Sequence, residues 1–349
     1  MEVDDNNDNG DWDYAFNEIH RLLSSLNLGL HEPINPYAPV FRYISALFAE
    51  MAYHHIPEWE VDKRKRAQIA RVPSSAYQSM VGSGEWRFDR ITQAFQMADL
   101  PRPFIATSAG VVAVGVVIRG ILFIGFRGTA LLFDWKVNLR AELVRVSIFQ
   151  QTISHRFFDE SCYQDKTIYC GGVHSGFAEE SLRITKRIID AIPAADRSSI
   201  KHVFLGGHSL GGAVAAISKN LIREWPTTAY LFGAPRYSDV GGYMTVDGDH
   251  PIQTRRPGDL VPTVPPRSYG FCDHPVELTT SGEEYIDTSL NSCLVSDIYN
   301  WMKFIFTKAS DHSMEAYRKE IGEAVEAKLA KAPLTKARLI EKIDIRSTF

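Results

Sequence analysis

A serine between two glycines is the part of this sequence best suited to covalent catalysis. The pattern is G-x-S-x-G, formed by Gly207, His208, Ser209, Leu210 and Gly211. The residues just before it form a short apolar run typical of a strand, and those just after it are small, as in a tightly packed helix. A strained serine backbone leaves no room for neighbouring side chains, which explains the glycines. The pattern therefore predicts a nucleophilic serine displayed on a sharp turn between a strand and a helix.

Histidines downstream of Ser209 are the candidates for the base that a serine hydroxyl needs. In α/β-hydrolases the acid and then the histidine follow the serine along the chain. The three downstream histidines are His250, His274 and His312. His312 stands at the break between two expected helices, where a loop can carry an imidazole across the edge of a sheet, so it is the predicted base. We expect His274 to hold a loop by hydrogen bonding.

Asp259 is the predicted acid that orients this base. It follows an expected strand at 252–256 and opens the run Asp-Leu-Val-Pro-Thr-Val-Pro-Pro at 259–266. Because proline restricts the backbone, this run would hold a carboxylate in a defined position. Since a Pro-Gly pair precedes Asp259, an ordinary turn aspartate is the alternative.

Two backbone donors are expected to bind the oxyanion that forms during acyl transfer. One is the N–H of the residue after the nucleophile, Leu210. The other should come from an earlier strand that ends in a loop, and residues 124–129, Ile-Gly-Phe-Arg-Gly-Thr, fit this description. Thr129 can offer its backbone N–H and its hydroxyl, although a plain strand end would show the same residues. Each such donor contributes about 2.7–4 kcal/mol to transition-state stabilisation.

The composition is that of a globular chain and argues against several other classes. The 349 residues include 45% hydrophobic and 23% charged residues, which is enough for a sizeable core. A net charge of −4 gives no reason to expect a nucleic-acid partner. The 4 cysteines are too few for a disulfide scaffold and lack zinc-ligand spacing. We expect free thiols, with one disulfide as the alternative, and no metal site.

Neither a secretory signal nor a membrane span is expected from the sequence. The first residues are acidic and polar, the reverse of a signal peptide. The best candidate for a span, 110–124, is shorter than the roughly 18 residues required, and Arg119 and Gly120 interrupt it. It predicts two buried strands joined by a turn. We expect a protein of the cytoplasm, one in peripheral contact with a membrane, or one exported without a signal peptide.

Helix-like and strand-like segments alternate along most of the chain. This alternation predicts an α/β protein with a mainly parallel central sheet covered by helices on both faces. Functional residues in such sheets lie in loops at the carboxyl ends of strands, as Ser209 and Asp259 would. Helices are expected at 14–28, 36–71, 175–192, 289–306 and 313–330, and strands at 104–127 (a pair), 168–170, 202–206, 228–232 and 252–256.

A single α/β domain is expected over residues 13–330, with N-terminal helices and a C-terminal helical tail. Residues 1–12 are acidic and polar and are expected to be disordered. The tail at 331–349 is basic. A solvated terminal helix is expected there, with a helix that docks on a membrane surface or a partner as the alternative.

Together these motifs resemble the class 3 lipase family, the fungal-type triacylglycerol lipases and their plant and bacterial relatives. The resemblance extends from about residue 40 to about residue 320 and depends on five blocks in the family's order. It implies the α/β-hydrolase fold. The blocks are Phe126-Arg127-Gly128-Thr129 with Asp134-Trp135, Val173-His174-Ser175-Gly176-Phe177, Gly207 to Ala213, Phe232-Gly233-Ala234-Pro235-Arg236, and Asp259-Leu260-Val261-Pro262 with Pro265-Pro266.

The resemblance assigns a role to each candidate catalytic residue. It implies a triad of Ser209, Asp259 and His312, and an oxyanion hole formed by Thr129 and Leu210.

Two further positions are expected to serve structure rather than chemistry. Asp239 stands where the family usually has an asparagine, and we expect this difference to affect a loop. His174 is a family residue that precedes the nucleophile. The segment 150–170 departs from the compact secreted fungal enzymes, so substrate and location stay open.

Residues 130–149 are the candidate for a lid, which family members often place just after the oxyanion residue. Their leucines and tryptophan recur at i, i+4 spacing and would form one apolar stripe on a helix. We expect a lid or acyl-binding helix that opens at a lipid surface, with ordinary core packing as the alternative. The residues concerned are Leu131, Leu132, Trp135, Leu139 and Leu143.

These features predict a serine carboxylic-ester hydrolase that acts on lipid esters through an acyl-enzyme, with no metal or organic cofactor. Phospholipase A1, monoacyl- or diacylglycerol lipase and feruloyl-type esterase are alternatives, because the same fold and triad serve all of them. A non-catalytic lipase-like signalling protein is a rival from another class. The expected partners are a lipid or other ester substrate and a lipid–water interface, with no nucleic acid; the oligomeric state stays open.

Overall fold

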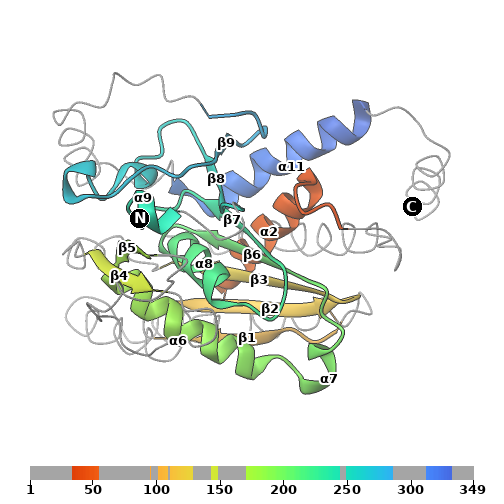
Figure 1. Ribbon diagram of the computed structural model, residues 1–349. Helices are drawn as coiled ribbons and strands as arrows, with labels where there is room; N and C mark the ends of the chain where they lie inside the picture. The colour runs from red at the N-terminus through yellow and green to blue at the C-terminus, as the bar shows by residue number, and fades with distance from the viewer. Residues whose placement is uncertain are drawn as a thin grey trace, which may run out of the picture.

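A central sheet with helices on both faces organises the chain (Figure 1). The computed structural model describes residues 34–54, 95, 101–108, 111–128, 143–147, 170–243, 249–285 and 312–331. The helices expected at 14–28 and 289–306, the acidic N-terminus at 1–12 and the tail after 331 lie outside these residues.

Within the described part of the chain, seven strands form the central sheet in the order β1-β2-β3-β6-β7-β8-β9. The first three strands pair antiparallel, and the remaining neighbours pair parallel, so the sheet is mainly parallel as predicted. Three strands take the place of the strand pair expected at 104–127. Residues 104–107 form a separate strand, which pairs antiparallel with the strand at 112–118. The bounds are β1 Phe104–Thr107, β2 Val112–Ile118, β3 Ile121–Arg127, β6 His202–His208, β7 Thr227–Phe232, β8 Ile252–Arg255 and β9 Glu277–Thr279.

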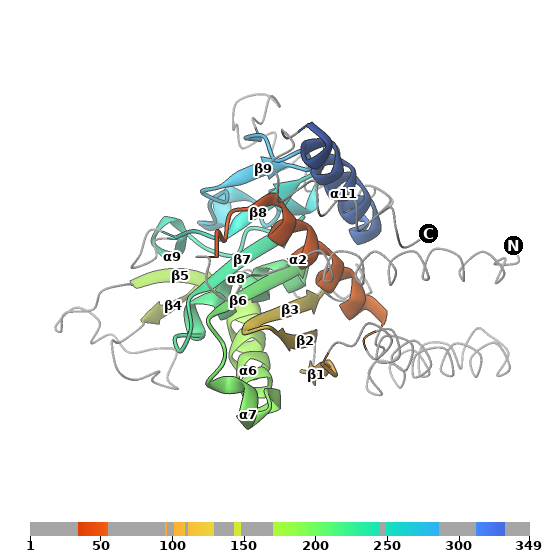
Figure 2. The same cartoon turned by 90° about the vertical axis from the view of Figure 1, so that its right-hand side faces the viewer.

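Helices cover the two faces of this sheet in pairs (Figure 2). α6 (Ser175–Ala191) and α8 (Leu210–Leu221) lie on one face, and α2 (Pro39–Met51) and α11 (Met314–Lys331) lie on the other. The shorter helices are η1 Ala52–His54, α7 Ala194–Arg197, α9 Val240–Tyr243, η3 Val261–Thr263 and η4 Arg267–Tyr269.

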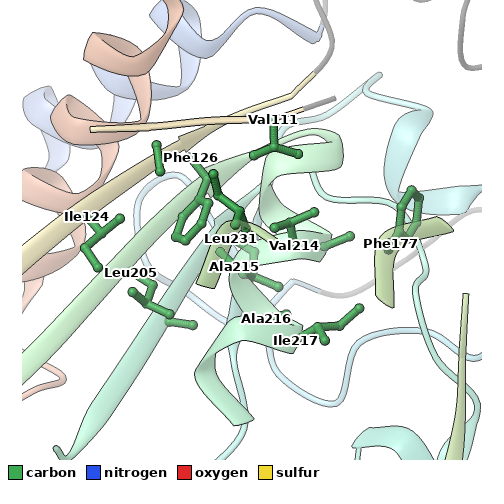
Figure 3. Close-up of a cluster of buried hydrophobic side chains, with 14 of the residues drawn as sticks. Val111, Ile124, Phe126, Phe177, Leu205, Val214, Ala215, Ala216, Ile217 and Leu231 are labelled. Atoms are coloured by element: carbon green, nitrogen blue, oxygen red, sulfur yellow. The ribbon is translucent and has the colours of Figure 1, made fainter. Parts of the chain in front are cut away.

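Successive residues of the central strands point to opposite faces, and both faces are apolar. On β6, Val203 and Leu205 belong to the core cluster under α6 and α8, whereas Phe204 belongs to the cluster under α2 and α11. Figure 3 shows the first cluster, in which Leu205 of β6 lies beside Ile124 of β3. A strand buried on both faces is expected in a sheet with parallel pairing and helices on each side.

The helix α2 lies against the sheet at backbone distance. A Cβ atom added to Gly206 of β6 would lie 2.1 Å from the carbonyl oxygen of Ser45, and one added to Gly125 of β3 would lie 1.8 Å from that of Phe48. Only glycine permits this approach. The two glycines therefore set how deeply α2 seats, and with it the position of η1, which follows directly.

A second, two-stranded sheet corrects part of the sequence prediction. β4 (Leu143–Ser147) pairs antiparallel with β5 (Cys170–His174), so Leu143 begins a strand and is not part of a helical stripe. The pairing with β5 supplies the hydrogen bonds that the backbone of this strand needs. The other candidate lid residues, Leu131, Leu132, Trp135 and Leu139, lie outside the described residues.

Most other elements have the predicted type with shifted ends. The helix expected at 36–71 is α2, which ends at Met51 and continues only as η1 in the described residues. The strand at 168–170 is seen as β5, and the helix at 313–330 as α11. No helix in the described ranges is both long enough and apolar enough to cross a bilayer.

Candidate active site

Ser209 stands alone between the end of β6 and the start of α8. Its backbone dihedrals are φ 58° and ψ −132°, and among the described residues only Arg119 is another non-glycine residue with positive φ. Such a conformation costs about 1–3 kcal/mol and persists only where surrounding structure enforces it. The Ser209 N–H donates to the carbonyl of Phe232 at 3.0 Å, so the neighbouring strand β7 holds the turn.

The glycines on both sides of the serine are required by close backbone contacts. A Cβ atom on Gly207 would lie 2.3 Å from the carbonyl oxygen of Gly211. A Cβ atom on Gly211 would lie 2.6 Å from the carbonyl oxygen of Phe126 at the end of β3. The G-x-S-x-G pattern therefore has the steric origin that the sequence suggests.

Asp259 lies in the loop after β8, is 3% exposed and accepts hydrogen bonds on both carboxylate oxygens. The Val261 N–H donates to Oδ1 at 2.9 Å, which holds the carboxylate in the turn. Oδ2 accepts from the Tyr317 hydroxyl at 2.6 Å and from Nδ1 of His312 at 2.9 Å. Buried carboxylates need such donors, and three of them meet here.

His312 lies just before α11 and is oriented by Asp259. With a proton on Nδ1 directed at the carboxylate, Nε2 carries the lone pair that a general base requires. Nε2 is buried and has no hydrogen-bond partner among the residues that the structure describes. An unpaired buried nitrogen of this kind is costly, which is expected where a substrate or a serine proton completes the arrangement.

The serine turn and His312 meet at the carboxyl ends of β6, β7 and β8. The His208 ring, next to Ser209, stacks on the His312 ring with centroids 4.4 Å apart. A Cβ atom on Gly233, which follows the carbonyl that binds the Ser209 N–H, would lie 3.1 Å from Cε1 of His312 and 2.5 Å from Oδ2 of Asp259. The three residues predicted from the sequence are therefore gathered at one edge of the sheet.

Leu210 begins α8, and its N–H lies in the first helical turn, where backbone donors have no partner within the helix. The end of β3 runs beside it, because a Cβ atom on Gly128 would lie 3.1 Å from the Leu210 nitrogen. Thr129, the predicted second donor, is the next residue and lies outside the described residues. Backbone N–H groups at the N-terminus of α8 carry the partial positive charge that stabilises a developing oxyanion.

Tyr317 is a site residue that the sequence did not indicate. Its hydroxyl donates to Asp259 and accepts from the Arg256 N–H at 3.1 Å, which joins α11 to the loop after β8. Burial, and then the charge of Asp259, raises the pKa of Tyr317 well above its usual value, so the hydroxyl keeps its proton and remains a donor. The sequence gives no separate signal for Tyr317, because it fits the apolar pattern of the helix expected at 313–330.

His274 and His174 have the structural roles expected of them. His274 Nε2 contacts the carbonyl oxygens of Pro235 at 3.1 Å and Ala234 at 3.3 Å, so it ties two loops together. His174 stacks on Phe177 with centroids 4.1 Å apart. Burial lowers the pKa of each imidazole to about 4, which keeps both neutral near neutral pH.

Asp239 also belongs to a loop contact rather than to the triad. Its Oδ2 accepts from the Gly172 N–H at 2.8 Å, which fastens the segment before α9 to β5. The difference from the family's usual asparagine therefore falls on a loop, as predicted.

Comparisons with known proteins agree with the motifs. Residues 123–269 match the protein-family model described as "Lipase (class 3)". A curated relative, "Secreted mono- and diacylglycerol lipase 1" of Fusarium solani, is 28% identical over 144 residues, which cover 38% of this chain and 42% of that protein. The match thus spans less than half of the relative's length.

Solved structures of fungal lipases are also similar to this chain. The triacylglyceride lipase of Rhizomucor miehei has a TM-score of 0.46 and 16% identity, over 80% of this chain and 94% of that one. Lip2 lipase of Yarrowia lipolytica has a TM-score of 0.40 and 20% identity, over 53% and 68%. The strand order and the serine turn described above are those of an α/β-hydrolase, and the family match over residues 123–269 confirms the predicted resemblance to the class 3 lipases.

Proposed function

We propose that this protein hydrolyses carboxylic esters of lipids, with Ser209, His312 and Asp259 as its catalytic triad. The observation that carries the proposal is the hydrogen bond of 2.9 Å from His312 Nδ1 to Asp259 Oδ2, next to a serine in a strained turn. A carboxylate that fixes the imidazole tautomer and a displayed serine are the two requirements of serine acyl transfer.

In the proposed reaction, His312 Nε2 removes the Ser209 proton as Oγ attacks the ester carbonyl carbon. The negative charge on the carbonyl oxygen is bound by the Leu210 N–H and, from the sequence prediction, by Thr129. His312 then gives its proton to the departing alkoxide, which leaves the acyl group on Ser209. A water molecule, deprotonated by the same imidazole, hydrolyses this acyl-enzyme and restores the serine.

Asp259 stabilises the imidazolium that forms in both steps. Its remaining lone pairs are already engaged by Tyr317 and the Val261 N–H, so the carboxylate stays in position while His312 gains and loses its proton.

Glycerides are the first substrates to test. The curated relative is named as a mono- and diacylglycerol lipase, and its region of similarity favours these esters for this chain too. Triacylglycerols and phospholipids are the next candidates, because the same triad serves all of them. A panel of these lipids and short-chain nitrophenyl esters would rank them by kcat/KM.

The variant Ser209→Ala tests the proposed nucleophile. We expect kcat on nitrophenyl esters to fall roughly 10⁴-fold or more, because only oxyanion stabilisation and binding remain. The matched control is Ser218→Ala on the same helix, since that hydroxyl is buried and accepts from Thr185 at 2.8 Å, far along α8. The control should lose stability and keep kcat. Ready turnover by the Ser209 variant would overturn the proposal and favour a non-catalytic lipase-like protein.

A further inference from the structure

Tyr53 lies on η1, directly after α2, and its hydroxyl contacts the residue before the nucleophile. The distance from the Tyr53 hydroxyl to His208 Nδ1 is 2.5 Å, and the two rings meet edge to face with centroids 5.5 Å apart. The two residues are 155 positions apart in sequence, and they come from η1 and from the end of β6. Because α2 is seated on the sheet by glycine contacts, the position of Tyr53 is fixed by packing rather than by a mobile loop.

The same side chain lies beside the end of β3, since the Arg127 guanidinium carbon is 6.0 Å from the centre of the Tyr53 ring. Burial raises the pKa of Tyr53, so its hydroxyl keeps its proton. A protonated hydroxyl can donate to a neutral imidazole nitrogen, and the contact with His208 Nδ1 fits this arrangement.

His208 has no other hydrogen bond to orient it in the described structure. Its Nε2 is buried without a partner there, and the contact with Tyr53 engages Nδ1. The ring stacks on His312 with an interplanar angle of 28° and meets Tyr317 with centroids 5.9 Å apart. The face of the proposed catalytic imidazole is therefore supported by a ring whose orientation depends on Tyr53.

We infer that Tyr53 is a positioning residue for the proposed esterase reaction: its hydroxyl bonds to His208 Nδ1 and holds the His208 ring as a neutral support for His312. This inference rests on the proposed function. Tyr53 also lies between the end of β3, at Arg127, and the serine turn, at His208.

Neutrality of His208 is a physical requirement of such a support. His312 becomes an imidazolium during each turnover, and a second positive ring at 4.4 Å would oppose that charge. Burial and then the neighbouring His312 lower the pKa of His208 well below its usual value. A proton donated by Tyr53 to Nδ1 occupies the lone pair that a second proton would need.

The charged and titratable groups near His208 come from three elements among the described residues. Tyr53 faces it from η1, His312 from the segment just before α11, and Tyr317 from α11 itself. Arg127 of β3 lies 6.0 Å from the centre of the Tyr53 ring. No carboxylate is found in direct contact with His208 in the described structure, so nothing there favours its protonation.

The variant Tyr53→Phe tests this inference, with Tyr37→Phe as the matched control. Tyr37 lies just before α2, and its exposed hydroxyl donates to Asp249 at 2.9 Å, away from the triad. In Tyr53→Phe we expect kcat to fall roughly 10- to 100-fold with KM little changed, because small misplacements of catalytic groups have effects of this size. Tyr37→Phe should leave both constants unchanged.

Covalent labelling by a fluorophosphonate separates positioning from a merely structural role. A positioning role lowers the rate of labelling while the final amount per chain stays as in the wild type. A merely structural role reduces the fraction of folded protein, so it lowers the final amount of label per chain. A lower final amount with an unchanged rate of labelling would overturn the inference. A Tyr53→Phe variant with the wild-type kcat would also overturn it.

A second variant asks whether Tyr53 acts through His208. His208→Phe keeps an aromatic ring and removes Nδ1, so adding Tyr53→Phe to it should lower kcat much less than Tyr53→Phe does alone. The full effect in both backgrounds would contradict the inference. Absence of ester hydrolysis and of labelling in the wild type would instead overturn the proposed function on which it rests.

Discussion

Asp259 shows how much of a candidate catalytic residue's environment lies outside the sequence motif that identifies it. The sequence predicts the carboxylate from its position after a strand and before a proline-rich run. It does not predict the donors, because Tyr317 is 58 residues away and reaches Asp259 only once α11 packs on the sheet. Tyr53 is a similar case, since it lies 155 residues from His208. Contacts of this length depend on packing and have no local sequence signal.

Removal of the Tyr317 hydroxyl should weaken the proposed base–acid pair. In Tyr317→Phe we expect kcat to fall roughly tenfold or more, because a hydrogen bond to a charged group contributes about 1.5–3 kcal/mol. The Arg256 N–H also loses its acceptor, so the free energy of unfolding should decrease by about 1–3 kcal/mol. Steady-state kinetics and urea unfolding would measure the two effects.

The matched control for that variant is Tyr243→Phe. Tyr243 is buried and its hydroxyl donates to the Cys272 carbonyl at 3.1 Å, outside the triad. We expect a similar loss of stability with kcat retained. Equal kcat in the Tyr317 variant and the wild type would show that this donor has no part in the reaction.

At the scale of elements, local pattern predicted helices and strands well where packing agreed with it. β6, α8, β7 and β8 fall where apolar runs and small residues indicate them. The stretch at 143–147 differs, because its leucine fits a helical stripe while pairing with β5 makes it a strand. The lid helix expected over 130–149 therefore does not include residues 143–147.

The space around two glycines predicts opposite effects for their changes to alanine, because only Gly206 lies against α2. In Gly206→Ala the new methyl group meets the Ser45 carbonyl oxygen at 2.1 Å, so we expect a loss of about 1–3 kcal/mol or more. In Gly176→Ala, on the exposed first turn of α6, the nearest contact is 3.5 Å, so we expect a gain of about 0.5–1 kcal/mol. Denaturant unfolding measures both, and equal stabilities would contradict the packing described for α2.

For the whole molecule, the sheet explains why three residues spread over the chain can act together. Ser209 follows β6 and Asp259 follows β8, and parallel strands bring their carboxyl ends to one edge, where the segment before α11 places His312. The order of the motifs along the chain was therefore sufficient to predict that these residues lie at the carboxyl edge of the sheet.

Buried neutral histidines make the stability of the whole molecule depend on pH. Burial lowers the pKa of His174 and of His274 to about 4 in the folded protein, whereas an unfolded histidine has a pKa of 6.5. Between these values the unfolded chain binds more protons, so stability is fully present above 6.5 and decreases as the pH falls toward 4. Each group contributes about 3 kcal/mol to this loss.

Thermal unfolding followed across that pH range checks this expectation. In His274→Gln, whose amide can still donate to the Pro235 carbonyl, the dependence of Tm on pH should become shallower. A slope identical to that of the wild type would show that His274 does not carry the effect.

The most direct test of the central claim is the site of covalent labelling by a fluorophosphonate. A serine activated by His312 and Asp259 should be phosphonylated selectively, and peptide mass mapping should find a single adduct on Ser209. The adduct should be absent in Ser209→Ala and form more slowly in His312→Gln, since the base is then missing. A folded wild-type protein that takes no label, or takes it on another residue, would contradict the account.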